Sequence, residues 1–390
     1  LALVRPKVKQ RVSVEASALA RVRALPRTAP RVLFHAPSMG ELEQCLPVIH
    51  AVRRYRPEVD VVVSCSSPSG YNHALRCPEI TAACYLPPDA PDLMAEFLNA
   101  VAPTVVVIDR YDVWPGFIAE CTRRSIPIVL MNATFPSAAR NPVLRGLLRD
   151  TYTQLTSVTA VSDEDARALR TLIGRDVPVL PDTRMDRVRE RIASPDADLE
   201  RFRRTDHTTI VCGSCWPPDE ELVFDALAIV PDPTLRLIIV PHEPTEDALR
   251  RIEARLTVTR LSRADAGTQG HLVVDSVGKL LSLYALADAA FVGGGFGAGV
   301  HSVAEPAGYG LPLACGPAID RSRDATDLVR QGACTVVRSA SDVATWIRTA
   351  VLDDQTRRQI GSQSSQYVFD RSGSSEQYAL HITTFLSEGP

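Results

Sequence analysis

The chain has 390 residues, of which 45% are hydrophobic and 23% charged, a globular composition too long for one ordinary core. The formal net charge of −3 argues against a general nucleic-acid binder, and nine cysteines without regular spacing argue against a disulfide framework. No apolar run approaches the roughly 18 residues of a membrane span. We therefore expect two globular domains.

Strands alternate with helical segments along the first half, which predicts an α/β domain with a parallel sheet. The predicted strands are 31–35, 59–65, 104–109, 126–131, 157–161 and 177–180, and the helices between them include 40–55, 92–101, 114–124 and 163–173. The Arg- and Asp-rich stretch 182–207 breaks this rhythm and contains no predicted strand. We expect a first domain over 1–190 and a linker over 191–207.

A second α/β series predicts a similar domain over 208–390. Its predicted strands are 208–213, 235–240, 257–261, 271–274, 289–293, 311–315 and 334–337. The stretch from Asp353 reads as helical, and its last helix can return to the first domain. The fold class is therefore α/β, with two Rossmann-like parallel-sheet domains facing a central cleft.

Ligands of open α/β sheets collect at the carboxyl ends of the strands, so the loops there are candidate sites. The first strand is followed by Ser38, Gly40 and Glu41, in which the Ser-to-Glu spacing also fits an ordinary capping box. Ser67 and Ser69 follow the second strand in a Pro-Ser-Gly turn. Their hydroxyls suit a sugar or carboxylate, although turn chemistry also explains them.

Another strand ends in Asp109, which is followed by RYDVWP with Arg110 and Asp112. Two carboxylates, an arginine and two aromatic residues gather at this strand end, which favours a site. A partly exposed ion pair beside a core tryptophan is the alternative.

In the second half, Gly213 and Ser214 follow one strand and His242 follows the next. The richest segment is FVGGGFGAGVHSVAEPAGYGLPLACGP at 291–317. Its candidate ligand-binding residues are Gly295, Gly297, Gly299, His301, Ser302 and Glu305. Glycines let the backbone approach a ligand closely, and the helix N-terminus behind them can bind a phosphate.

Glu305, one turn into that helix, can accept two ribose hydroxyls, so the segment predicts a nucleotide-sugar site. A tight strand-to-helix turn with no ligand is the alternative. The dinucleotide fingerprint does not fit. Asp196 and Asp198 have the D-x-D form of some metal sites but lie in the linker, and we expect no metal.

Seven motifs in order resemble one family. HAPSMGELEQ, SSPSGY, RYDVWP, DTRMDRV at 182–188, GSCWPPDEE, PHEP and GGGFGAGVHSVAEP resemble segments of the 3-deoxy-D-manno-octulosonic acid (Kdo) transferases, which have the GT-B fold. Three departures stand out. Asp112 replaces the glutamate of many members, Ser302 replaces the usual asparagine, and the Pro-His loop lacks an arginine.

The resemblance implies an inverting transfer of Kdo from CMP-Kdo to lipid IVA, the lipid A precursor, in lipopolysaccharide biosynthesis. It implies Glu41 as general base, Asp112 as a second catalytic carboxylate, and the second-half loops as the donor site. Ser38, Gly40, Ser67, Ser69 and Arg110 would then bind the acceptor, whose phosphates Arg140 and Arg145 could also meet.

The implied enzyme needs no metal or cofactor besides its donor and does not bind nucleic acid. It would work in peripheral contact with the cytoplasmic face of the bacterial inner membrane. A membrane anchor preceding Leu1 is compatible with this sequence. Leu42 and Leu46 either lie under acyl chains or, as we expect, form helix core.

Three alternatives share the fold. Another GT-B transferase would use a UDP-sugar and would not need HAPSMGELE. A non-hydrolysing sugar-nucleotide epimerase would place more His and Arg in the cleft. A non-catalytic nucleotide-sugar binding protein is compatible with Asp112 and Ser302.

Overall fold

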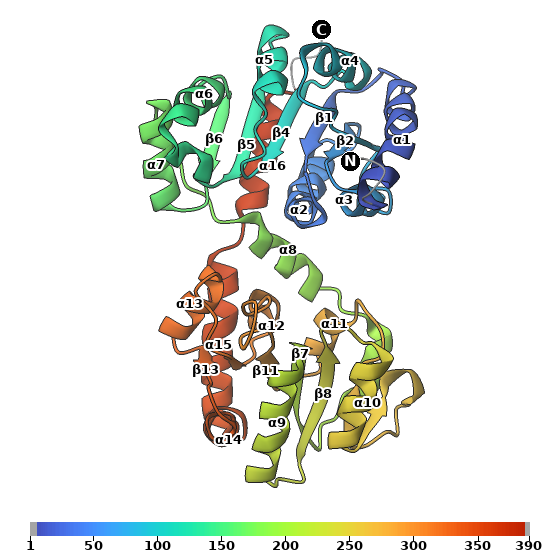
Figure 1. The fold of residues 1–390 in the computed structure, drawn as a ribbon, viewed down its shortest axis with the longest axis vertical. Coiled ribbons are helices and arrows are strands. Elements are labelled where there is room, and N and C mark those ends of the chain that lie inside the picture. Colours follow the sequence, from blue (N-terminus) through green and yellow to red (C-terminus); the bar gives the residue numbers. More distant parts are fainter. Residues whose placement is uncertain (1–5, 387–390) are drawn as a thin grey trace. The chain divides into compact units, whose positions relative to one another are not determined.

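The computed structural model describes residues 6–386, without the side chains of 6–13, 140 and 143. The chain divides into two compact units, drawn in Figure 1. The first unit consists of Leu1–Arg187 and Ser372–Pro390, and the second of Val188–Arg371. Each unit contains one parallel sheet with helices, which confirms the predicted α/β class with two parallel-sheet domains.

The first sheet has six parallel strands in the order β3-β2-β1-β4-β5-β6. The strands are β1 (Arg31–His35), β2 (Asp60–Cys65), β3 (Ala82–Tyr85), β4 (Val105–Asp109), β5 (Ile128–Ala133) and β6 (Ser157–Ala160). The helices of this unit include α1 (Pro6–Arg23), α2 (Met39–Tyr55), α3 (Pro68–Ala74), α4 (Pro91–Val101), α5 (Pro115–Arg123), α6 (Pro142–Tyr152), α7 (Asp163–Ile173) and α16 (Ser374–Thr384).

The second sheet has seven parallel strands in the order β13-β12-β11-β7-β8-β10-β9. The strands are β7 (Thr208–Cys215), β8 (Leu235–Pro241), β9 (Val258–Arg260), β10 (His271–Val273), β11 (Ala289–Val292), β12 (Leu313–Cys315) and β13 (Cys334–Val336). The helices include α9 (Pro217–Ile229), α10 (Glu246–Arg255), α11 (Leu280–Tyr284), α12 (Ala304–Gly308), α13 (Arg323–Arg330), α14 (Ala340–Trp346) and α15 (Asp354–Asp370).

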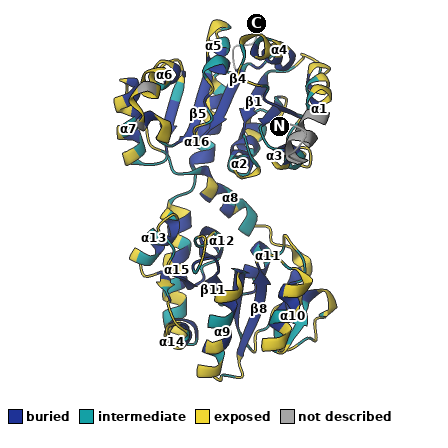
Figure 2. Ribbon diagram, in the orientation of Figure 1, coloured by how far each residue is buried: buried dark blue, intermediate teal, exposed yellow. Residues whose placement is uncertain are grey.

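Strands rich in valine and isoleucine form the core of each unit. The central strands β1 and β4 are buried along their whole length, because helices cover both faces of a parallel sheet. Figure 2 shows the strands in dark blue, while exposed residues gather on the helices. The apolar runs of the sequence therefore identified most strands within two residues.

Two strand predictions differ from the structure. The segment 177–180 forms only an isolated bridge between Val179 and Ala160, because Pro178 and Pro181 lack the N–H groups that a ladder needs. Strand β3 was not predicted, since its four residues give too short a pattern to stand out.

The boundary between the units lies within α8 (Thr183–Ile192), earlier than the expected linker at 191–207. Within that expected linker, η2 (Ala197–Phe202) buries Leu199 and Phe202 in the second unit. The last helix, α16, lies in the first unit (red in Figure 1), the domain to which the sequence allowed it to return. There it packs against α2, and the Tyr378 hydroxyl accepts a hydrogen bond from Asn132 N at 3.1 Å.

Helix α15 packs against α12, and its Gly361 lies against Gly310 in the turn that follows α12. A Cβ atom added at Gly361 would overlap the carbonyl oxygen of Gly310. We therefore expect Gly361→Ala to lower the free energy of unfolding by about 1–3 kcal/mol, because backbone must move to admit the methyl group. Thermal and denaturant unfolding of the purified variant measures this loss.

Gly146→Ala is the matched control, because Gly146 also lies in a helix but has no neighbour within 4 Å. It should leave stability unchanged or raise it by about 0.5–1 kcal/mol, since alanine is the better helix former. Equal effects of the two variants would contradict the packing argument.

Candidate functional site

In the first unit, β1 lies between β2 and β4, so the strand order reverses direction there. Ligands of open α/β sheets bind at such a switch point, outside the carboxyl ends of the strands. The loops after β1 and β4 contain the predicted residues Ser38, Gly40, Glu41, Arg110 and Asp112. The topology therefore brings together two segments that the sequence separates.

A buried histidine joins these two strand ends. His35, the last residue of β1, has no solvent exposure, and its Nε2 lies 2.8 Å from Asp112 Oδ2. Its Nδ1 lies 2.9 Å from Ser64 Oγ at the end of β2. Burial raises the pKa of the Asp112 carboxyl, but hydrogen bonds from His35 and Trp114 outweigh burial and lower it. Asp112 is thus held as a carboxylate beside the switch point.

Glu41 lies in the first turn of α2, half-buried. Ser38 caps this helix: its hydroxyl accepts from Gly40 N and donates to the Glu41 carboxylate, which also accepts from Ser38 N at 3.1 Å. The capping box that the spacing allowed is therefore present. It fixes the Glu41 side chain in the first turn of the helix, at the positive end of the helix dipole.

The loop after β2 is bonded to the loop after β1. The amides of Ser66 and Ser67 donate to Pro37 O at 3.0 and 2.9 Å. Ser67 caps α3, and its hydroxyl lies 3.2 Å from that of exposed Ser69. Both predicted serines therefore lie beside the Glu41 segment.

Arg110 is engaged within the protein. It has a left-handed backbone with φ of 67°, its Nε donates to Gln44 Oε1, and its Nη2 donates to Asp182 Oδ2, both at 2.8 Å. This arginine holds α2 in place, and a role in acceptor binding remains a prediction.

The other residues proposed for the acceptor differ in their surroundings. Arg145 is exposed on α6, whereas the Arg140 side chain lies outside the described residues. Leu42 and Leu46 are buried, which confirms that they are helix core.

In the second unit, the strand order reverses at β7, which lies between β11 and β8. Gly213 and Ser214 lie near the end of β7, and the loops after β11 and β8 contain the glycine-rich segment and His242. Two glycines permit close packing here, Gly213 against α11 and Gly293 against the end of β7. A Cβ at Gly213 would overlap the Tyr284 hydroxyl, and one at Gly293 would lie 2.6 Å from Cys215 Cα. Ser214, with φ of 53°, adopts the left-handed conformation at this crossing.

One buried carboxylate ties the loops after β7 and β11 together. Asp219 has no solvent exposure, and its Oδ2 accepts hydrogen bonds from Trp216 N and Gly294 N, both at 2.9 Å. Burial raises the pKa of this carboxyl, and the two backbone hydrogen bonds oppose that rise. Asp219 was not among the predicted site residues.

The glycines of the 291–317 segment have separate roles. A Cβ at Gly295 would lie 2.6 Å from Gly316 Cα, so this glycine serves loop packing. Gly299 has φ of 127°, where an L side chain is strained. Gly297 borders a pocket and is free of close contacts, so its backbone is open to a ligand.

The helix expected behind these glycines begins only at Ala304 and has five residues. Glu305 lies in its first turn, as predicted, and forms an ion pair with Arg191 at 3.0 Å. A ribose would have to share this carboxylate with Arg191. Ser302 is exposed beside it.

Three aromatic rings from the three loops meet at the switch point. His242 stacks on Trp216 with ring centroids 4.4 Å apart and on His301 with centroids 4.6 Å apart. Trp216 Nε1 donates to His301 Nε2 at 3.2 Å. Beside them lies a pocket of about 260 Å³, lined by Trp216, Pro217, Pro218, Asp219, Phe296, Gly297 and Ala298. His242 and His301 are thus brought together as the sequence suggested, with Trp216 added.

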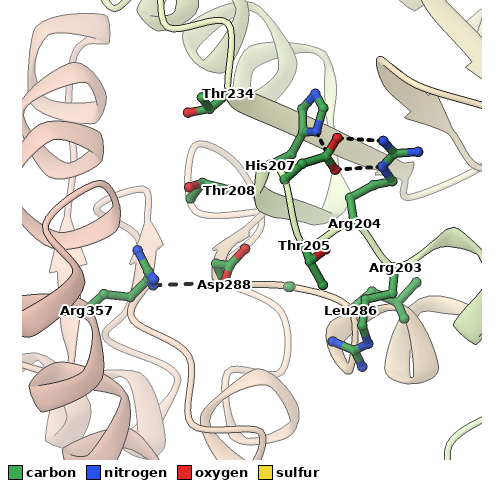
Figure 3. A pocket seen from close by; sticks show the side chains of 11 residues that line it. Arg203, Arg204, Thr205, His207, Thr208, Thr234, Leu286, Asp288 and Arg357 are labelled. Atoms are coloured by element: carbon green, nitrogen blue, oxygen red, sulfur yellow. Dashed lines mark hydrogen bonds and ion pairs between the residues drawn. The ribbon is translucent and has the colours of Figure 1, made fainter.

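A larger pocket of about 480 Å³ lies at the opposite edge of this sheet, before β7, β8 and β11 (Figure 3). It is lined by Arg203, Arg204, Thr205, Asp206, His207, Thr208, Thr234, Leu286, Ala287, Asp288 and Arg357. Its three arginines pair with carboxylates: Arg203 with Glu200, Arg204 with Asp206, and Arg357 with Asp354. Since its charges are compensated and it lies away from the strand carboxyl ends, we do not assign the donor site to it.

Sequence reasoning missed His35, Trp216 and Asp219 as site residues, although it quoted the motifs that contain them. The available signal was the position of His35 and Trp216 directly at strand ends and of Asp219 in the first turn of the following helix. Among the described residues, no helix is both long and apolar enough to cross a membrane. Within that same part of the chain, no group of three or more His, Cys, Asp or Glu residues is arranged for a metal ion. The expectation of a metal-free reaction stays a prediction.

Comparisons with known proteins agree on one family. The family model described as 3-deoxy-D-manno-octulosonic-acid transferase (kdotransferase) matches residues 7–187. The chain is 27% identical to the 3-deoxy-D-manno-octulosonic acid transferase of Chlamydophila psittaci over 327 residues, 79% of this chain and 75% of that one. It is 25% identical to the Bordetella pertussis enzyme of the same name over 369 residues, 87% of this chain and 83% of that one.

The fold is shared more widely. The solved structure of the UDP-GlcNAc 2-epimerase from Neisseria meningitidis matches with a TM-score of 0.63 at 12% identity, covering 92% of this chain and 100% of that one. At this identity the likeness shows the fold alone, and it confirms the predicted GT-B class. The family model covers most of the first unit and the relatives extend over most of both, which confirms the resemblance of this chain to the Kdo transferase family of glycosyltransferases.

Proposed function

We propose that this protein transfers Kdo from CMP-Kdo to lipid IVA with inversion at the anomeric carbon. The observation that carries the proposal is Glu41, fixed by its capping box after β1, the strand whose last residue, His35, is bonded to Asp112. The match of the Kdo transferase family model to this same unit supports the choice of sugar.

The proposed reaction begins with a poor nucleophile, the primary hydroxyl of the acceptor. Glu41 accepts its proton as the oxygen attacks the anomeric carbon of Kdo, while the bond from that carbon to the CMP phosphate breaks. CMP leaves with the bonding electron pair. Attack from the face opposite the leaving group inverts the configuration. Asp112, held by His35, would orient the acceptor.

In this proposal the second unit holds the donor. The Gly297 backbone, exposed His242 and half-buried His301 would meet the CMP phosphate, with Ser302 assisting, and Glu305 would bind the ribose. No metal ion or other cofactor takes part in the proposed step, since CMP is itself a good leaving group.

The acceptor is a lipid, so we also propose peripheral contact with the cytoplasmic face of the inner membrane. The exposed residues Leu144, Arg145, Leu147 and Arg149 of α6 support this, because apolar and cationic side chains together favour an anionic lipid surface.

The test supplies lipid IVA in anionic vesicles together with freshly generated CMP-Kdo, and follows the product by mass spectrometry. We expect the acceptor to gain the mass of one or more Kdo residues, and the protein to float with the vesicles. Transfer from a UDP-sugar instead would favour another GT-B transferase. Tight CMP binding without turnover would favour a nucleotide-sugar binding protein.

A further inference from the structure

The aromatic cluster of the second unit determines the protonation of His301. Trp216 and His301 come from the loops after β7 and β11, and their ring nitrogens are 3.2 Å apart. Both rings stack on His242 at small interplanar angles of 24° and 15°. Because Trp216 Nε1 and His301 Nε2 are this close, the indole and the imidazole meet edge to edge. The His242 ring stacks on both of them.

The direction of the hydrogen bond is fixed by chemistry. An indole N–H can only donate, so His301 Nε2 must accept and cannot carry a proton. The neutral imidazole then carries its single proton on Nδ1. Burial, and then the neighbouring His242, lower the pKa of His301, which agrees with a neutral ring. In the described part of the chain, the only hydrogen bond of this ring is the one from Trp216.

The backbone around the pair is built to hold it. Asp219 binds the amides of Trp216 and Gly294, which fixes the two loops at one separation. Gly294 lies under the imidazole, and a Cβ there would be 2.9 Å from His301 Cδ2. The apolar pocket beside Trp216 continues from this cluster to Gly297. The free Nδ1–H therefore belongs to a fixed ring at the candidate donor site.

We propose that Trp216 is a positioning residue that holds His301 as the neutral Nδ1–H tautomer, so that His301 donates a hydrogen bond to a phosphate oxygen of the donor nucleotide. A neutral donor stabilises the phosphate charge that develops as the nucleotide leaves, without trapping the product as an imidazolium–phosphate ion pair would. The identity of the nucleotide rests on the proposed function, whereas the tautomer does not.

The tautomer is measured on the full chain by ¹⁵N NMR of the imidazoles at about pH 8, with the His301 signal among the eight histidines assigned by its loss in His301→Gln. In wild type we expect Nδ1 protonated and Nε2 unprotonated. In Trp216→Phe, which keeps an aromatic ring but removes the N–H donor, we expect a mixture with substantial Nε2–H. A wild-type signal from the Nε2–H form would overturn the proposal, and so would an unchanged tautomer in Trp216→Phe.

Trp346→Phe is the control, because Trp346 is a buried tryptophan of the same unit outside the candidate site. It should leave the His301 signal where it is in wild type. Titration with CMP then tests the ligand: we expect about tenfold weaker binding in Trp216→Phe than in Trp346→Phe.

The outcomes distinguish the positioning role of Trp216 from the identity of the bound nucleotide. Weaker CMP binding with an unchanged tautomer would make Trp216 a stacking platform only, which overturns the positioning role. Failure of wild type to bind CMP would contradict the proposed donor, and with it the assignment of the Nδ1–H to a phosphate of that donor. The NMR result would still decide whether Trp216 fixes the tautomer.

Discussion

Glu41→Gln is expected to lower the rate of Kdo transfer by about 10²–10⁴-fold, the usual contribution of a positioned general base. Glutamine keeps the shape of the side chain and can complete the capping box with Ser38. The loss should therefore come from the missing basicity and not from unfolding of α2. Initial rates at saturating CMP-Kdo and lipid IVA measure the effect, and thermal unfolding checks that the fold is kept.

Glu164→Gln is the matched control. Glu164 also lies in the first turn of a helix of the same unit, α7, but it is exposed and outside the site. Its variant should transfer Kdo at the wild-type rate. A Glu41→Gln enzyme retaining a tenth or more of the wild-type rate would remove Glu41 from the role of base.

Asp219→Ala is expected to destabilise the second unit by about 2–4 kcal/mol, because it leaves two backbone N–H groups without their acceptor. The loops after β7 and β11 would then separate, so CMP binding should weaken by at least tenfold. Asp219→Asn should do less harm, since its amide oxygen can still accept from Trp216 N and Gly294 N. Denaturant unfolding and CMP titration measure the two effects.

The pH dependence of stability gives a second test of Asp219. Its pKa is raised in the folded protein, so its contribution to stability is fully present below the ordinary carboxyl pKa of about 4. That contribution is lost as the pH rises through the folded-state value. Asp219→Asn lacks this titration. Wild type should therefore lose stability relative to Asp219→Asn as the pH rises. A constant difference across this range would contradict the raised pKa.

Local features of the site could be read from the sequence because each depends on a few neighbouring residues. The spacing of Ser38 and Glu41 predicted the capping box, and the position of Glu305 predicted its place in the first turn of its helix. Glycines at 294 and 299 have positive φ angles, as a strand-to-helix loop requires. These are interactions within one helical turn or one loop.

The surroundings of two predicted ligand-binding residues could not be read in this way. Arg110 is bonded to Asp182 and Glu305 to Arg191, and these partners are 72 and 114 positions away in sequence. A charged residue at a strand end suggests a ligand, but only the folded chain shows which protein groups already share its charge. Any ligand must compete with these ion pairs.

By itself, the sequence determined the α/β class, most of the strands, and the motifs of the Kdo transferase family. Buried parallel strands need continuous runs of valine and isoleucine, and such runs are visible in one dimension. The tertiary structure decided which strand ends are neighbours. It joined His35 to Asp112 across 77 positions, Asp219 to Gly294 across 75, and Trp216 to His301 across 85. The reversal of strand order at β1 and at β7 creates these contacts. Strand order cannot be predicted from hydrophobic periodicity, because that pattern depends only on neighbouring residues.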